Sequence, residues 1–339
     1  MSSKKIYTDP ISIKKVAKIF NIFLLKFSVL LIILMLFLVF YKFTYRVFSN
    51  DYILDIIIKS NMHSRQCLYL DESDPILLKK LDNFYNSIDN KYLVPTIFFN
   101  KMPTTSFYKE QDTQIKKSVY INILLPILLD IQKESLKERS KLIEINSRMV
   151  NEPLMEEDFI FLDNLASKYK VKLSGNNFWN YVDAIDKLLL KVDAIPNSLA
   201  LAISAKETGW GTSRFLKEGN SLFSQWAWST EHGIVPLLRK KTETHVVRKF
   251  NNLEDAVRSF YLNINTHPAY SNFRVTRREM RLKEGHLKAK RLVPHLTNYS
   301  TEENYTNIIN SIITANSLEQ FDNYNEFSKK YRVICLSVL

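Results

Sequence analysis

The longest apolar stretch of the chain lies near its N-terminus. Residues 19–41 are almost wholly apolar, and the part from Phe27 to Tyr41 carries no charge. A helix over 19–41 would span roughly 34 Å, which is enough to cross a bilayer core of about 30 Å. The lysines at its edges, Lys26 and Lys42, are long enough to extend toward the membrane interface. The pattern therefore predicts a transmembrane helix over 19–41.

A cleaved signal peptide is the main alternative for this stretch. Its apolar part would be shorter and would be followed by small residues at a cleavage site, whereas residues 42–52 contain no such site. A retained signal anchor is therefore favoured. Five lysines and one acid, Asp9, precede the apolar stretch. By the positive-inside rule, residues 1–18 form a cytoplasmic tail of a single-pass inner-membrane protein, and the rest of the chain is periplasmic.

The pattern after the anchor changes along the chain. Residues 42–92 show no strong period and are interpreted as a membrane-proximal segment. A helical extension is expected over 93–173, because apolar residues recur at three- and four-residue steps over roughly 112–146. Pro126 lies inside that helical pattern, so the helix is expected to kink there or to start just before it. A turn is predicted over 150–158.

A compact domain is predicted over 174–325, followed by a tail over 326–339. Its first part indicates a helix over 177–191 and a second helix that begins near Pro196 and ends at Gly209. The segments 221–229 and 245–250 are typical of strands.

The last part of this domain is predicted to be helical again. Asn252, followed by two acids, marks the start of one helix. Ser300 and Glu303 have the spacing of a capping box, which would open a helix to about residue 316. The predicted fold class is therefore α+β, mainly helical with a small β lobe.

Composition is consistent with a globular protein and leaves its partners open. Hydrophobic residues make up 46% of 339 residues, with 6 glycines and 10 prolines, which argues against a disordered or fibrous chain. The formal charge of +12 suits nucleic acid, lipid headgroups or an acidic polymer, or only a solvated surface with topology signals. Cys67 and Cys335 form no zinc motif, so no metal is expected; whether they pair is open.

The segment around Glu207 carries the candidate chemistry. Glu207 lies at the end of the apolar helix that Gly209 terminates, with Trp210 and Gly211 directly after it. A rigid helix would fix the carboxyl group, an apolar wall would raise its pKa, and the glycines would let a bulky sugar chain approach. Glycoside cleavage needs such a general acid. The alternative is an ordinary charged last turn that faces solvent.

The same segment resembles the core motif of the Bax-type glucosaminidases, a family shared with the flagellar rod muramidase domain (glycoside hydrolase family 73). The motif matches at Ala205, Glu207, Thr208, Trp210, Gly211, Thr212, Ser213, Arg214, Phe215, Gly219, Asn220, Leu222, Phe223 and Trp226. Residues 262–274 and 298–305 agree with the Bax type in particular, and the resemblance covers about 93–323. The chain departs from the family at Lys206, where an amide is usual, and at Ser221 and Ser224, where Asn and Gly are usual. Lys206 could lower the pKa of Glu207 if the two side chains meet.

The resemblance implies a lysozyme-like fold in which a helical body and a β-hairpin lobe flank a groove. It implies cleavage of the β-1,4 bond after N-acetylglucosamine in peptidoglycan glycan strands, with Glu207 as the general acid. The family places a second carboxylate on the hairpin, where this chain offers Glu231 and Glu243. We select Glu243, although it could be a solvated charge, and the acetamido group of the substrate could replace a protein nucleophile.

Several aromatic residues are candidates for the same site. Tyr299 matches a paired-tyrosine motif and is expected to orient the acetamido group or a water molecule. The residues expected to bind substrate are Trp210, Phe223, Trp226, Tyr270 and Tyr305. Aromatic residues are more often part of a core, so some of these five should be packing residues. No cofactor is expected.

Three other functions remain to be weighed. A lytic transglycosylase would share the fold and the single glutamate. A membrane-tethered glycan-binding or envelope scaffold protein would keep the groove without activity. Nucleic-acid binding is not expected, because no binding motif is present and the predicted topology places the domain outside the cytoplasm. Residues 201–300 instead carry 17 Lys and Arg against 8 Asp and Glu, a charge that suits the peptide carboxylates of peptidoglycan.

Overall fold

A computed structural model describes residues 35, 68–70, 97–99, 101–102, 113–173, 178–300 and 302–322. The chain divides into two units, 1–60 and 61–339, and the elements below belong to the second. The predicted transmembrane helix, apart from Met35, lies outside the described residues, as do the N-terminal tail, both cysteines and the tail over 326–339. Among the helices that the structure describes, none is both long and apolar enough to cross a membrane.

Helix α5 (Thr113–Arg148) is the longest described element and confirms the predicted helix over 112–146. Pro126 lies inside it, so the helix does not start at this proline. The buried positions of its first half, among them Ile123, Leu124 and Leu128, recur at short helical steps and form one apolar face. Before α5, two short strands, β1 (Leu68–Leu70) and β2 (Ile97–Phe99), pair in parallel.

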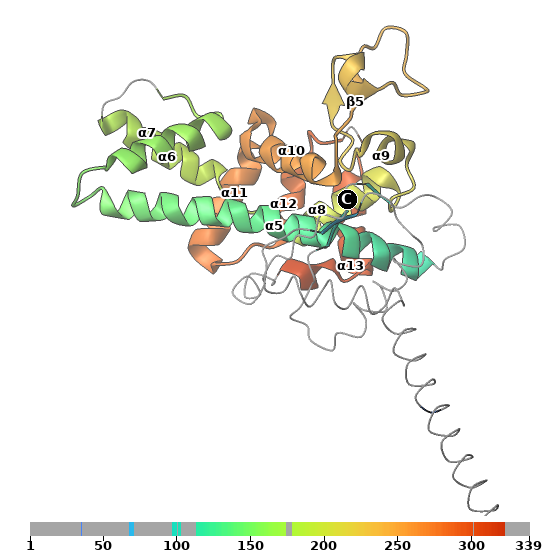
Figure 1. Cartoon of the computed structure of the whole chain (residues 1–339), viewed down its shortest axis with the longest axis horizontal. Helices are drawn as coiled ribbons and strands as arrows, with labels where there is room; N and C mark the ends of the chain where they lie inside the picture. Colours follow the sequence, from blue (N-terminus) through green and yellow to red (C-terminus); the bar gives the residue numbers. More distant parts are fainter. Residues whose placement is uncertain are drawn as a thin grey trace, which may run out of the picture. The chain divides into compact units, whose positions relative to one another are not determined.

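Two helices pack against the second half of α5. They are α6 (Glu156–Lys168) and α7 (Phe178–Lys191). The predicted helix over 177–191 is confirmed, whereas the turn predicted over 150–158 already gives way to α6 at Glu156. Leu142 of α5 shares a second core cluster with Leu162 of α6 and Leu188 of α7. Figure 1 shows this small cluster of helices at one end of α5, away from the lobe that contains β5.

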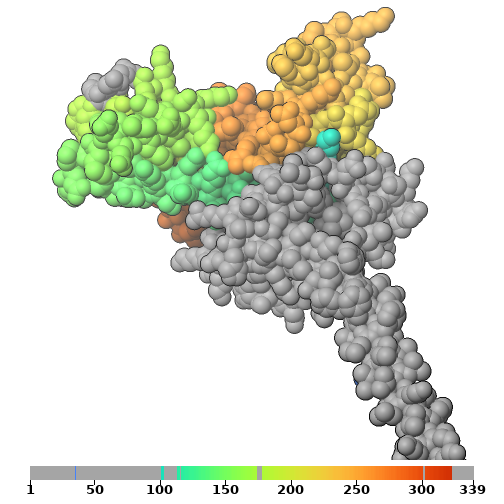
Figure 2. Space-filling model, in the orientation of Figure 1, coloured from blue at the N-terminus to red at the C-terminus, as the bar shows by residue number. Residues whose placement is uncertain are grey.

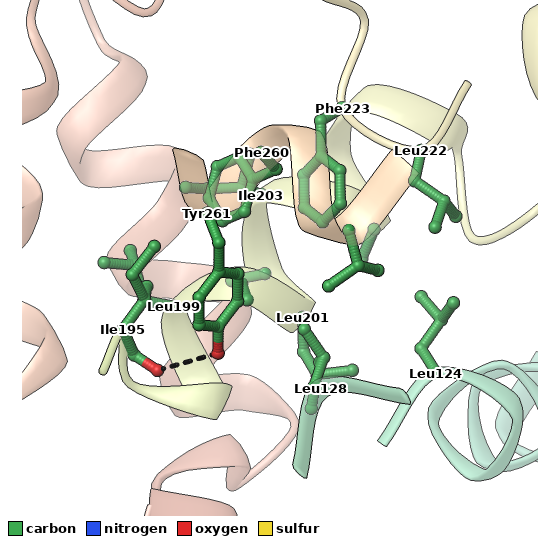
Figure 3. Close-up of a cluster of buried hydrophobic side chains, with 14 of the residues drawn as sticks. Leu124, Leu128, Ile195, Leu199, Leu201, Ile203, Leu222, Phe223, Phe260 and Tyr261 are labelled. Carbon is green, nitrogen blue, oxygen red and sulfur yellow. Dashed lines mark hydrogen bonds between the residues drawn. The ribbon is translucent and has the colours of Figure 1, made fainter. Parts of the chain in front are cut away.

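Helix α8 (Asn197–Thr208) lies at the centre of the main core, and ten of its twelve residues are buried. Pro196 precedes it, and Gly209 ends it in the left-handed conformation with φ +56°, as predicted. Helices α5, α10 (Leu253–Thr266) and α13 (Tyr305–Ala315) surround α8. Figure 3 shows Leu199, Leu201 and Ile203 of α8 among side chains from α5 and α10.

The first half of α5 therefore belongs to the same core as α8. The sequence prediction placed this half in an extension over 93–173, separate from the domain over 174–325. Tyr120 of α5 connects the two directly, because its hydroxyl group lies 2.5 Å from the Ser204 hydroxyl oxygen and 2.9 Å from that of Thr208. The last turn of α8, which carries Glu207, is thus held by α5.

A buried ion-pair network fixes the chain before α8. Asp193, in the α7–α8 connection, accepts hydrogen bonds from Arg281 at 2.9 and 3.2 Å. Arg281 and the fully buried Arg277 both lie on α11 (Ser271–Glu284). Arg277 donates to the carbonyl oxygens of Leu190 and Lys191 at the end of α7. Two further short helices, α12 (Ala289–Leu292) and η3 (Val293–Leu296), follow α11.

A small lobe separates α8 from α10 in sequence. Helix α9 (Arg214–Gly219) leads into strands β3 (Trp226–Ala227), β4 (Gly233–Ile234) and β5 (Val246–Arg248), with η1 (Thr230–His232) between β3 and β4. The strands form an antiparallel sheet in the order β3-β5-β4. The strand predicted over 221–229 is too long, because Ser224 adopts a positive φ of +48° that interrupts extended structure.

The predicted capping box at the last helix is wrong. The Ser300 hydroxyl oxygen accepts a hydrogen bond from the Glu302 amide, and α13 begins only at Tyr305, after Asn304. The local hydrogen bond of Ser300 closes a turn instead of opening a helix. The predicted fold class is otherwise confirmed in its coarse form, as a mainly helical domain with a small antiparallel sheet.

Candidate functional site

A cavity of about 1650 Å³ lies between the lobe and the helical body. Its walls come from the end of α8, α9, the lobe, α10 and the segment 297–300. Figure 2 shows the surface hollowed between the lobe and the neighbouring helices. Of the predicted site residues, the structure brings five to this cavity: Glu207, Phe223, Trp226, Tyr270 and Tyr299.

Glu207 lies in the last turn of α8, and its side chain is 16% exposed. Burial raises the pKa of this carboxyl group above its ordinary value. A hydrogen bond from the Ser224 side chain and the charge of Lys206 act in the opposite direction, whereas Glu302 reinforces the rise. The effect of burial exceeds both opposing effects. Glu207 is thus a groove-lining carboxyl group that holds its proton to a higher pH than a solvated glutamate.

Lys206 does meet Glu207, as the sequence suggested, but it faces another carboxylate as well. Its ammonium nitrogen lies 3.8 Å from Glu207 Oε1 and 2.6 Å from Glu302 Oε2. The same nitrogen is 5.1 Å from the centre of the Tyr305 ring. Because the closer carboxylate is Glu302, the lysine only partly offsets the rise that burial causes in the pKa of Glu207.

Ser224 also contacts Glu207, and the sequence analysis did not assign it to the site. It lines the cavity and has φ +48°, a conformation that costs a non-glycine residue about 1–2 kcal/mol. Its side chain bonds the Glu207 carboxyl group. The departure from the usual glycine at this position was visible in the sequence, but its contact with Glu207 depends on the turn that follows α9.

Three tyrosines lie beside the carboxyl group. The Tyr299 hydroxyl group donates a 2.8 Å hydrogen bond to the Phe223 carbonyl oxygen, and Tyr299 and Tyr270 both line the cavity. The ring of Tyr305 stacks on Tyr299 with centroids 5.9 Å apart. Tyr305 is buried and does not line the cavity. Burial, and then the charge of Glu207, raise the pKa of its hydroxyl group.

The aromatic residues predicted to stack on sugars divide into two groups. Trp226 is 61% exposed and lines the cavity, as does the 72% exposed Trp228, which the sequence also offers as a residue that could stack on a sugar face. Phe223 is buried, and its ring stacks on Phe260 at 4.0 Å (Figure 3). Trp210 lies outside the cavity lining, with its ring edge-on to Tyr120. The exposed tryptophans of the lobe are therefore the available platforms.

The two carboxylates of the lobe lie in different places. Glu231, in η1, is exposed and lines the cavity. Glu243 does not line it; its Oε2 accepts a 3.2 Å hydrogen bond from the Lys240 amide and closes a turn before β5. The structure therefore brings Glu231, and not the selected Glu243, to the cavity of Glu207. Within the described residues, no group of three or more His, Cys, Asp or Glu residues could hold a metal ion.

Comparison with known proteins agrees with this site. Residues 182–318 match the family model described as mannosyl-glycoprotein endo-beta-N-acetylglucosaminidase. The chain is 29% identical to Protein bax of Escherichia coli (strain K12) over 198 residues, which cover 57% of this chain and 67% of that protein. The comparison with solved structures returned no match. The matched region extends from α7 to just beyond α13 and contains Glu207 and most of the cavity wall. Residues 182–318 are therefore similar to this glucosaminidase family, and the similarity supports a glycan hydrolase in general.

Proposed function

We propose that the protein is an endo-β-N-acetylglucosaminidase that cleaves the β-1,4 glycosidic bond of peptidoglycan glycan strands, with Glu207 as the general acid. One observation carries the proposal: a partly buried carboxyl group with a raised pKa lies on the wall of a cavity large enough for a sugar chain. A family match that includes Glu207 supports the same reaction class.

The proposed acid step follows from the surroundings of Glu207. The leaving oxygen of a glycosidic bond must receive a proton as the bond breaks. A carboxyl group with a raised pKa keeps its proton to higher pH and can supply it to the leaving oxygen, and burial raises the pKa of Glu207. Ser224 and Lys206, which favour the ionised form, would then stabilise the carboxylate that remains after proton transfer.

The second chemical role has two candidates. Glu231, which lines the cavity, would act on a water molecule or on the sugar ring, whereas Glu243 was the choice from sequence. Alternatively, the acetamido group of the substrate attacks, and no second carboxylate is needed. Parallel measurement of Glu231→Gln and Glu243→Gln distinguishes these cases, because a loss in only one variant identifies the residue and a loss in neither favours the acetamido group.

The exposed rings of Trp226 and Trp228 are the proposed sugar platforms. Their ring planes differ by 86°, so they could not both stack flat on one sugar. The two tryptophans would contact different parts of a strand lying in the cavity. Such a wall suits an extended glycan that the enzyme cleaves within the strand.

The proposed location rests on the sequence pattern. A transmembrane helix over 19–41 with a cytoplasmic N-terminus would keep the domain on the periplasmic side of the inner membrane. Peptidoglycan lies in that compartment, so the anchor would hold the enzyme beside its substrate. Fusion of a periplasm-specific reporter after residue 322 tests this topology.

Digestion of purified peptidoglycan by the full chain in detergent tests the function. Products are reduced with borohydride and identified by mass spectrometry, with Glu207→Gln as the inactive variant and Glu279→Gln as the matched control. Glu279 is an exposed glutamate of α11 outside the cavity. We expect reducible N-acetylglucosamine ends from the wild type and Glu279→Gln, and none from Glu207→Gln.

Other products would assign a different reaction. Reducible N-acetylmuramic acid ends would indicate a muramidase, and anhydro ends a lytic transglycosylase. No release by a folded wild-type protein that binds the glycan would exclude the hydrolase and favour the scaffold function.

A further inference from the structure

The cavity wall carries more positive than negative charge. Seven lysine and arginine residues line it, against four aspartate and glutamate residues. Two of the seven cations are already neutralised: Lys206 pairs with Glu302, and Arg258 pairs with Glu134 and Glu254. The excess of positive charge therefore lies in the remaining cations.

Three of these cations gather where the lobe joins the body. Lys217 is on α9, and Arg248 and Lys249 are at the end of β5. Among the described residues, none of the three takes part in an ion pair, whereas their neighbour Glu218 is paired with Arg214 at 3.0 Å. All three are exposed on the cavity wall. We call Lys217, Arg248 and Lys249 the junction cations.

The backbone that carries the junction cations is held in place. The Arg248 amide donates to the Gln225 carbonyl oxygen, and the Lys249 amide to that of His232, at 2.8 and 2.9 Å. Lys249 passes so close to α9 that a Cβ atom at Gly219 would lie 2.9 Å from Lys249 Cγ. The glycine thus allows the residue that follows β5 to pack against α9, the helix that carries Lys217.

We propose that the junction cations form a binding subsite for carboxylate groups, and that their ligand is the peptide side chain of a peptidoglycan strand lying in the cavity. This inference rests on the proposed function and adds a substrate class to it: strands that still carry their peptides. The sugars of the strand supply no carboxylate once the peptide is amide-linked to the lactyl group, whereas the peptide ends in free carboxylates.

The expected preference is modest and sensitive to salt. Each exposed ion pair contributes little, so we expect two or three together to give a preference of about three- to ten-fold. Salt at roughly 1 M shortens the Debye length to about 3 Å and should remove most of it. Stacking on the lobe tryptophans, which does not depend on charge, should remain.

The test compares two substrates for the full chain in detergent. One is a set of soluble glycan strands with their peptides, and the other is the same set after an amidase has removed them, which leaves a single lactyl carboxylate on each muramic acid in place of the peptide carboxylates. The readout is the ratio of kcat/KM for the two substrates, which cancels a general loss of activity. The variants are Lys217→Gln/Lys249→Gln and, as a control of equal charge change, Lys283→Gln/Lys288→Gln. Lys283 is in the last turn of α11 and Lys288 directly precedes α12, and neither lines the cavity.

We expect the wild type and the control to favour the peptide-bearing strands at low salt, and the junction variant to lower that ratio by about three- to ten-fold. Equal rates on both strands by the wild type, or an unchanged ratio in the junction variant, would overturn the subsite. Failure of the proposed function would show differently, as no cleavage of either strand. In that case, the preference for peptide-bearing strands is measured as binding, by co-sedimentation of the wild type and the junction variant with insoluble peptidoglycan before and after amidase treatment.

Discussion

Lys206 is closer to Glu302 than to Glu207, its own neighbour in the chain. Its ammonium nitrogen lies 2.6 Å from one Glu302 oxygen and 3.8 Å from one Glu207 oxygen. Glu302 stands in the turn before α13, almost a hundred residues away in sequence. This residue therefore decides how much of the lysine charge acts on the proposed catalytic acid.

Substitutions of Glu302 and Lys206 should move the pH profile in opposite directions. The pKa of Glu207 is raised, chiefly by burial, and Lys206 lowers it while Glu302 raises it. A general acid works only when protonated, so activity falls as pH rises through its pKa. We expect Glu302→Gln to shift the alkaline limb of kcat/KM to lower pH and Lys206→Gln to shift it to higher pH. Glu303→Gln, an exposed neighbour, serves as the control. Shifts in the same direction would contradict this arrangement.

Ser224 combines a strained backbone conformation with a hydrogen bond to Glu207, and two substitutions can measure these effects separately. Ser224→Ala and Ser224→Gly both remove the bond to Glu207 and should both move the alkaline limb to higher pH, because that bond favours the ionised form. Only glycine relieves the positive φ. We expect Ser224→Gly to be more stable than Ser224→Ala by about 1 kcal/mol, measured by chemical denaturation. Equal stabilities would mean that the turn is not strained.

The buried and exposed aromatics of the cavity should behave differently. Phe223→Ala removes a ring stacked on Phe260 and should lower the free energy of unfolding by about 3–5 kcal/mol. Trp226→Ala removes an exposed ring and should change it by less than about 0.5 kcal/mol, while weakening binding of soluble glycan strands. Denaturation and glycan titration of both variants check this. A strong loss of stability in Trp226→Ala would assign that ring to the lobe core instead.

Asp193 should be a major source of stability at neutral pH. Burial alone would raise its pKa, but Arg277, Arg281 and Arg139 outweigh this and lower it. A lowered folded pKa means that the contribution is present above the unfolded value, about 3.9, and is lost as pH falls through the folded pKa. Asp193→Asn leaves buried guanidinium groups without a counter-charge and should cost about 3–5 kcal/mol.

Asp186 forms an exposed ion pair with Arg278, so Asp186→Asn provides the matched control. This substitution should lower the free energy of unfolding by less than about 1 kcal/mol. Thermal or chemical unfolding at pH 7 compares the two variants. A similar, small loss in both would mean that the buried network contributes little.

Regular periodicity allowed much of the helical body to be predicted. The apolar steps of α5 and the helix-ending Gly209 placed α5 and α8 within a few residues of the observed bounds. The lobe was harder, because its strands have two or three residues and are defined by pairing with β5 instead of by a local pattern. The Ser300–Glu303 spacing was misleading because the serine hydroxyl group closes a local turn.

The motif around Glu207 predicted the acid, whereas its environment depends on contacts distant in sequence. Glu302 and Ser224 reach Glu207 from two other segments, and no spacing near residue 207 indicates either. The sequence offers both Glu231 and Glu243, and we selected Glu243 from it, whereas the path of the lobe places Glu231 on the cavity wall. Sequence alone also could not distinguish the exposed Trp226 from the buried Phe223.

The hydroxyl contacts between Tyr120 and the last turn of α8 bear on how the protein can be divided. The family match begins at residue 182, yet Tyr120 and the apolar face of α5 lie before that point and complete the core around α8. Gly211 belongs to the same contact, since a Cβ atom there would lie 3.1 Å from the Tyr120 ring. A fragment cut at the edge of the recognised domain would leave the helix of Glu207 uncovered on one side. The smallest autonomous unit of this protein must therefore start no later than α5, well before the first residue of the family match.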